Sequence, residues 1–84
     1  MYVIIQHSIN APTKFWEIVK GVKDVPAGMK LHSTLPSGDG KKAVCIWQAP
    51  SLKSVKNFVE PAVGALSSNE YFEVNEKNAM GLPH

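Results

Sequence analysis

The chain has 84 residues, with nine lysines but no arginine, seven acidic residues and a net charge of +2. This length predicts a single domain, residues 1–84, with a modest core. Arginine is the residue that usually reads guanine edges and clamps phosphates, and the scattered lysines form no basic stripe, so nucleic acid is not an expected partner. No apolar run reaches the roughly 18–20 residues needed to cross a bilayer, so a membrane-spanning protein is excluded.

The single cysteine, Cys45, excludes an internal disulfide. The start of the chain does not read as a secretory signal, because Gln6 and His7 interrupt its apolar residues. From these two observations we expect a cytoplasmic protein, and the lack of a spanning apolar run predicts no membrane partner.

Residues 2–9 are rich in β-branched and aromatic side chains and predict a first strand. Both faces of this strand carry apolar residues, which is typical of a central strand. Asn10 is expected to cap the following helix, with Pro12 in its first turn. The apolar stripe of that helix consists of Phe15, Ile18, Val19 and Val22. Trp16 lies beside the stripe, and we expect it to widen the core-facing side.

Residues 31–35 and 42–48 predict two strands, joined by a turn at residues 36–40 that is rich in proline and glycine. We expect Leu35 to pair with Lys42, which places His32 opposite Cys45 on one sheet face. The other face then carries an apolar set that we expect under the helices: Leu31, Leu35, Val44 and Ile46. The residues expected on the open face are Ala43, Cys45, Trp47 and His32.

A second helix is predicted to begin after Pro50 and Ser51, with apolar residues at helical spacing: Leu52, Val55, Val59, Ala62 and Leu66. Pro61 lacks an N–H, so we expect a break near Val59 and a short helical piece over residues 61–66. Residues 67–69 are predicted to form a loop. Residues 70–76 alternate and predict a last strand whose buried face carries Phe72 and Val74.

The resulting order, β-α-β-β-α-β, predicts an α+β fold of the ferredoxin-like type, with a four-stranded antiparallel sheet and two helices on one of its faces. The other sheet face is left bare and is expected to carry apolar side chains such as Trp47 and Ile4. Bare apolar faces of this kind are usually covered by another chain. We therefore expect a homodimer.

The chain resembles a known family in several runs: Leu-His-Ser at 31–33, Ala-Val-Cys-Ile-Trp-Gln-Ala-Pro at 43–50, Asn-Glu-Tyr-Phe-Glu-Val at 69–74 and Asn-Ala-Met-Gly-Leu-Pro at 78–83. These runs resemble short, largely uncharacterised bacterial ferredoxin-like proteins of the dimeric α/β-barrel superfamily, in which two sheets pack face to face. The resemblance implies a homodimeric barrel. A related group, similar across residues 32–33 and 45–50, includes a nickel-binding protein, but this chain lacks a His-rich cluster.

His32 and Cys45 can supply an imidazole and a thiolate to one nickel-like cation, because opposed strand residues hold their Cβ atoms about 5 Å apart. Two ligands do not complete a site, so His7, a carboxylate or the partner chain must supply a third. The alternative, which we favour, is a buried free Cys45 beside an ordinary strand histidine. Nucleophilic chemistry at Cys45 is not expected, because packing within a strand does not lower the thiol pKa.

The leading functional hypothesis is a small, mostly apolar molecule bound between the sheet and the helices. Trp47 or Trp16 is expected to line this ligand site, and His7 or His32 to orient the molecule. Metal binding through His32, Cys45 and His7 is one alternative. Another, which the resemblance allows, is a cofactor-free oxygenase or isomerase with His7 as general base. A purely structural dimer is the last alternative, and no cofactor is predicted.

Overall fold

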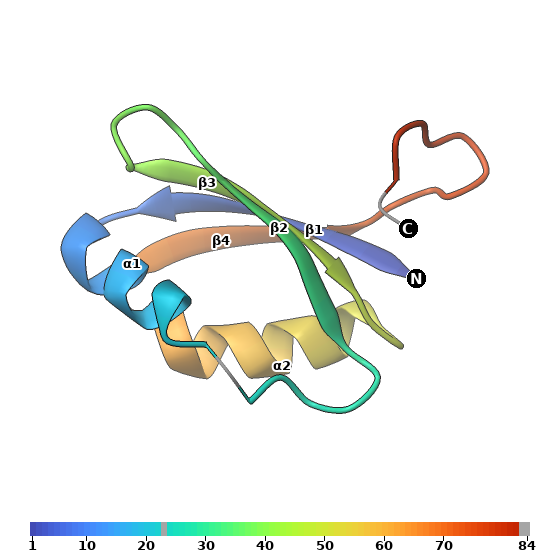
Figure 1. Ribbon diagram of the computed structural model, residues 1–84, viewed down its shortest axis with the longest axis horizontal. Coiled ribbons are helices and arrows are strands. Elements are labelled where there is room, and N and C mark those ends of the chain that lie inside the picture. Colours follow the sequence, from blue (N-terminus) through green and yellow to red (C-terminus); the bar gives the residue numbers. More distant parts are fainter. Residues whose placement is uncertain (23, 83–84) are drawn as a thin grey trace.

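The computed structural model describes residues 1–22 and 24–82 and shows a four-stranded antiparallel sheet with both helices on one face (Figure 1). The elements follow in the order β1 (Tyr2–Ile9), α1 (Pro12–Lys20), β2 (Lys30–Pro36), β3 (Lys42–Gln48), α2 (Leu52–Val63) and β4 (Ser67–Glu73). The strand order β2-β3-β1-β4 makes β1 central, as predicted. The ferredoxin-like α+β fold is thereby confirmed. Within the described residues, no helix combines the length and apolar character needed to cross a membrane.

The core lies between the sheet and the helices. Successive strand side chains point to opposite faces, so β1 buries alternate residues: Val3, Ile5, His7 and Ile9. One face of α2 contributes residues spaced by four: Val55, Val59 and Val63. Phe15 of α1 is fully buried between these layers. Burial of each large apolar side chain stabilises the fold by about 1.5–3 kcal/mol.

The face of β3 that meets the helices is not the predicted one. Its buried residues are Ala43, Cys45 and Trp47. Val44 and Ile46 are only partly buried and lie on the other face. The prediction was wrong because both faces of β3 are apolar, so alternation alone does not say which face meets the helices. The ring of Trp47 packs edge-on against Phe58 of α2, with 5.7 Å between ring centroids.

The β2–β3 hairpin also pairs in a different register. The N–H of Ser37 donates to the carbonyl oxygen of Lys42 at 2.8 Å, and Leu35 therefore pairs with Val44 rather than with Lys42. The turn sets this register, because the Ser37 hydroxyl donates to the Asp39 carboxylate at 2.8 Å and holds the turn short.

The hairpin register and an irregularity in β2 together move His32 away from Cys45. Thr34 pairs with Cys45, and the register shifts between Leu31 and Ser33, so His32 is an extra residue in the manner of a β-bulge. The prediction that His32 lies opposite Cys45 is therefore wrong. A bulge of this kind reverses the faces of the residues that follow it, so Leu35 lies on the open face although Leu31 packs against the core. Apolar alternation alone does not predict it.

α1 begins after Ala11, which makes no side-chain cap, so the predicted cap at Asn10 is wrong. The N–H groups of Asn10 and Ala11 both donate to the carbonyl oxygen of Leu66, at 2.8 and 3.2 Å. These bonds tie the β1–α1 corner to the α2–β4 corner. Pro12 occupies the first turn, as predicted.

α2 begins where predicted, because the Ser51 hydroxyl accepts the N–H of Ser54 at 3.0 Å. The helix then continues through Pro61 and ends at Val63, so the predicted break is wrong. Pro61 removes one hydrogen bond of the helical ladder. Val59 and Val63 are buried on either side of it, and their packing keeps the helix continuous.

β4 begins at Ser67, inside the segment predicted to be a loop. Tyr71 packs against the core, whereas Phe72 is 46% exposed. The predicted buried face, with Phe72 and Val74, is therefore wrong. Hydrophobicity favoured Phe72, but hydrogen bonds accommodate the polar side chain of Asn69 on the buried face instead.

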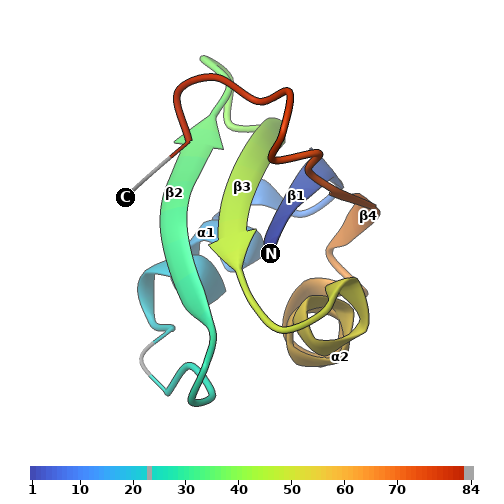
Figure 2. The ribbon, with the colours of Figure 1, turned by 90° about the vertical axis from the view of Figure 1, so that its right-hand side faces the viewer.

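Figures 1 and 2 place both helices on the same side of the sheet. The opposite face is left without a helix in the described part of the chain. Its apolar side chains include Ile4, Val44, Ile46, Leu35 and Phe72. Residues 74–82 follow β4 and turn away from the helices (Figure 2).

Candidate functional site

His7 is a polar residue in the apolar core. The alternation of β1 places it on the helix-facing side between Ile5 and Ile9, where it is only 4% exposed. The ring of Phe15 packs edge-on against the imidazole, with 5.2 Å between centroids. Buried polar groups need hydrogen-bond partners, and both ring nitrogens of His7 have one.

Asn69 is the partner of the first ring nitrogen. It lies opposite His7 in the pairing of β1 with β4. Its Oδ1 lies 2.5 Å from Nδ1 of His7, and its Nδ2 donates to a carboxylate oxygen of Glu60 at 2.8 Å. An ionised carboxylate only accepts, so Oδ1 must face the imidazole. The Ser67 hydroxyl also donates to Oδ1, at 2.7 Å. Nδ1 of His7 therefore carries the proton, and Nε2 of the neutral ring is an acceptor.

Glu60 of α2 is itself held in place, because the Tyr71 hydroxyl donates to the same carboxylate oxygen. The bonds from Tyr71 and then Asn69 favour the charged form and lower the pKa of the Glu60 carboxyl. Burial, with the Glu60 hydrogen bond, raises the pKa of Tyr71. At neutral pH an ionised carboxylate and a neutral phenol thus orient the Asn69 amide.

Cys45 is the hydrogen-bond partner of the second ring nitrogen of His7, with 3.3 Å between Sγ and Nε2. Burial is the main cause that lowers the pKa of His7 and raises that of Cys45. Both groups are therefore neutral at pH 7, and the thiol donates to Nε2. The Thr34 hydroxyl oxygen, 3.7 Å from Sγ, offers the thiol a second acceptor.

Cys45, His7 and Asn69 follow the bonding order of a thiol nucleophile, its base and the residue that orients the base. The protonation states do not match that role, because a cysteine nucleophile acts as a thiolate. Here burial raises the pKa of Cys45 and keeps the imidazole uncharged. The arrangement suits an oriented hydrogen-bond acceptor or proton acceptor at Nε2 better than covalent chemistry at Sγ.

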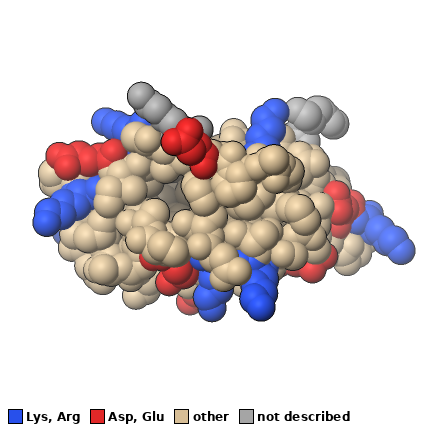
Figure 3. All heavy atoms as spheres, turned by 90° about the horizontal axis from the view of Figure 1, so that it is seen from below, with Lys and Arg blue, Asp and Glu red and all other residues tan. Residues whose placement is uncertain are grey.

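A cavity of about 40 Å³ lies beside this pair, between the sheet and the helices. A single water needs about 10–15 Å³, so the cavity holds only a few atoms. Its apolar walls include Phe15, Val19, Leu31, Trp47, Phe58 and Val63. Among the described residues that line it, none has a charged side chain. Figure 3 shows the helix side of the molecule, where a hollow lies within a surface of mostly uncharged side chains.

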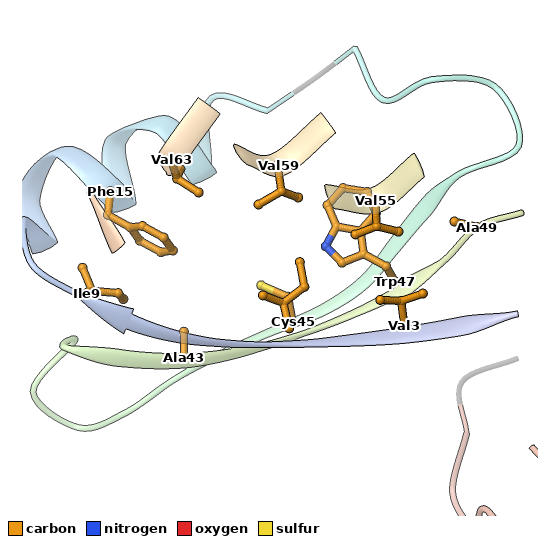
Figure 4. Close-up of a cluster of buried hydrophobic side chains, with 11 residues drawn as sticks. Val3, Ile9, Phe15, Ala43, Cys45, Trp47, Ala49, Val55, Val59 and Val63 are labelled. Atoms are coloured by element: carbon orange, nitrogen blue, oxygen red, sulfur yellow. The ribbon is translucent and has the colours of Figure 1, made fainter. Parts of the chain in front are cut away.

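The close-up of the core shows how the predicted residues lie around this space. Cys45 and Trp47 point from β3 toward α2, and Phe15 points in from α1 (Figure 4). Trp47 therefore lines the cavity. Trp16 faces the β2–β3 turn instead, where its Nε1–H donates to the Gly40 carbonyl oxygen at 3.0 Å.

His32 lies on the other face of the sheet. Its Nε2 is 2.9 Å from Oε1 of Gln48, and its ring centroid is 5.6 Å from that of Tyr2. The structure thus brings together His7 and Cys45 but not His32. Over residues 1–22 and 24–82, no group of three or more His, Cys, Asp or Glu side chains is placed to bind a metal ion. Metal binding stays a prediction from the sequence that this geometry does not favour.

Asn69, Glu60 and Thr34 complete the site and were not predicted. Extending the alternation of the last strand back to Ser67 would have placed Asn69 on the same face as Tyr71. No comparable signal exists for Glu60, since its contact with Asn69 depends on how α2 packs against β4.

Comparison with known proteins adds no assignment: no protein-family model, no curated protein and no solved structure gives a significant match to this chain. The fold therefore stands on the structure, and the function must be argued from the site.

Proposed function

We propose that the protein binds a small, mostly apolar molecule between the sheet and the helices, with His7 as its polar anchor. One observation carries this proposal: an apolar cavity lies against a single uncharged imidazole whose direction is fixed by Asn69. Ligand sites are commonly of this kind, with apolar walls and a few oriented polar groups. Trp47 supplies an aromatic wall.

Recovery of a bound molecule tests this function. Ala62 lines the cavity and is itself exposed, so Ala62→Leu should fill its mouth without disturbing the core. Ala65→Leu is the matched control, because Ala65 is exposed and lies outside the lining. Mass spectrometry of solvent extracts should find a small molecule with the parent and with Ala65→Leu, and much less with Ala62→Leu. Equal recovery from all three proteins, or none from the parent, would contradict the proposal.

We also propose that the protein is a homodimer that packs sheet against sheet, as in the dimeric α/β-barrel superfamily that its sequence resembles. The support is the uncovered sheet face, on which Leu35 and Phe72 are 56% and 46% exposed. The midpoint of thermal unfolding should then rise with protein concentration. Sedimentation as a monomer at micromolar concentration, with a constant midpoint, would rule the dimer out.

The oriented imidazole favours a second candidate, a cofactor-free enzyme in which His7 is the general base. Nε2 is unprotonated, as a base must be, and its partner Cys45 lines the same cavity as His7. A bound ligand with an acidic C–H should then exchange that hydrogen with deuterium from D₂O in the parent protein. Exchange at the same rate with His7→Phe would exclude His7 as the base.

A further inference from the structure

The acceptor nitrogen of His7 has a fixed direction. The ionised Glu60 orients Asn69, and Asn69 keeps the proton on Nδ1, so Nε2 can only accept unless the ring becomes charged. The imidazole is 4% exposed, and a charged ring is disfavoured by that burial. A group that binds Nε2 must therefore bring a proton of its own.

The present partner of that nitrogen is a weak one. A thiol is a poor hydrogen-bond donor, and Cys45 reaches Nε2 at 3.3 Å while Thr34 lies 3.7 Å from its Sγ. A ligand hydroxyl is a better donor than the thiol and can replace it as the hydrogen-bond partner of Nε2. Its oxygen can then accept the S–H of Cys45, so no buried group is left without a partner.

The described residues that line the cavity offer no charge that would neutralise a bound ion. No charged side chain is among the described residues that line the cavity, and Asn69 bonds both the imidazole of His7 and the carboxylate of Glu60. A carboxylate ligand would meet the lone pair of Nε2, and neither an anion nor a cation would find an opposite charge. Burying an unpaired ion is far more costly than burying a neutral hydroxyl.

We propose that the site selects neutral molecules that carry one hydroxyl donor on an apolar body, with the hydroxyl placed between Nε2 of His7 and Sγ of Cys45. This inference rests on the proposed ligand-binding function. The cavity of about 40 Å³ takes the hydroxyl and the first carbons. The rest of the body follows Ile18 and Ala62, which line the cavity and are exposed at its mouth.

Three probes of equal heavy-atom count test the selection: 1-pentanol, its isomer butyl methyl ether, and butanoate. Their dissociation constants can be measured from amide shifts of the isotope-labelled protein at pH 7. We expect 1-pentanol to bind at least tenfold more tightly than the ether, which cannot donate, because an unpaired buried polar group is strongly disfavoured. Butanoate should bind more weakly still.

Substitutions at the two polar partners locate the effect. In Cys45→Ser the protein supplies its own hydroxyl to Nε2, so the preference for alcohol over ether should fall at least threefold below that of Cys45→Ala. In His7→Phe the preference should disappear while the ether still binds. If His7→Phe does not fold, the two cysteine variants still decide the matter.

The outcomes separate the two proposals. If the ether or butanoate binds as tightly as 1-pentanol, the selection is overturned and the ligand-binding function stands. If the preference is the same in Cys45→Ser as in Cys45→Ala, the placement of the hydroxyl is overturned. If none of the three probes binds, both proposals fail.

Discussion

Each face of the sheet presents a histidine, and the two side chains lie in contrasting environments. His7 faces the helices, is 4% exposed and has a partner at each nitrogen, Asn69 at 2.5 Å and Cys45 at 3.3 Å. His32 sits at a bulge on the open face, partly exposed, with its Nε2 hydrogen-bonded to Gln48 at 2.9 Å. The covered face thus fixes both the protonation and the direction of its histidine. A histidine becomes a candidate binding group through the residues that hold it.

The largest contrast between the two faces should come from a pair of phenylalanines. Phe15 is fully buried under the helices, and Phe15→Ala should lower the free energy of unfolding by about 3–5 kcal/mol. Phe72 is 46% exposed on the open face, and Phe72→Ala should cost less than about 1 kcal/mol in the monomer. Urea denaturation measures both. A larger loss for Phe72→Ala that grows with protein concentration would show that a second copy covers this face.

Cys45 should react slowly in the native protein. It is 5% exposed, so a reagent rarely reaches the sulfur. Burial also raises its pKa, so little of the thiol is present as the reactive thiolate. We expect native labelling at least about a hundredfold slower than labelling in urea, because it waits for local opening. A Thr34→Ala variant, which removes a neighbour of the thiol but leaves it covered, should remain slow. Native labelling at the rate of an exposed model thiol would contradict the burial.

The two histidines should differ in their contribution to stability. His7→Phe keeps an aromatic ring but removes the hydrogen bonds to Asn69 and Cys45, so the free energy of unfolding should fall by about 1–3 kcal/mol. His32→Phe, at a partly exposed position, should change it by less than about 0.5 kcal/mol. Equal losses in urea denaturation would remove the distinction between the faces.

The smallest effect is a dependence on pH. The pKa of His7 in the folded protein lies below its ordinary value of about 6.5. As pH falls, His7 is therefore protonated in the unfolded chain before it is protonated in the folded protein. Stability should therefore be full above about pH 6.5 and decrease as pH falls from there toward the folded pKa. Glu60, whose pKa is also lowered, loses its contribution only at more acidic pH. The decrease just below pH 6.5 should vanish in His7→Phe and persist in His32→Phe; its persistence in His7→Phe would contradict the assignment.

The sequence was sufficient for the order of elements, because periods of 2 and 3.6 residues are local properties of strands and helices. It was also sufficient to select His7, Cys45 and Trp47, three residues that the structure places around one cavity. It did not predict which face of β3 meets the helices, because Val44 and Ile46 are as apolar as the residues that are buried. Apolar alternation carries no information on the bulge at His32 or the turn bonds of Ser37, which set the register.

The polar part of the site could not be predicted for a similar reason. Asn69 and Glu60 belong to a loop and a solvated helix face when each is judged by its own segment. They meet His7 only after β4 pairs with β1 and α2 packs against β4. Hydrogen-bond geometry between distant segments is a property of the folded chain, and residue type in sequence does not determine it.

The central claim is that His7 is a neutral imidazole with its proton on Nδ1 and its acceptor Nε2 directed at Cys45, beside the cavity. Long-range ¹H–¹⁵N correlation spectra of ¹⁵N-histidine-labelled protein at pH 7, with the His7→Phe variant to assign the signals, test it directly. For His7 we expect a protonated Nδ1 and an unprotonated Nε2 at pH 7, with a titration midpoint below 6.5. A proton on Nε2, or an imidazolium at pH 7, would contradict it.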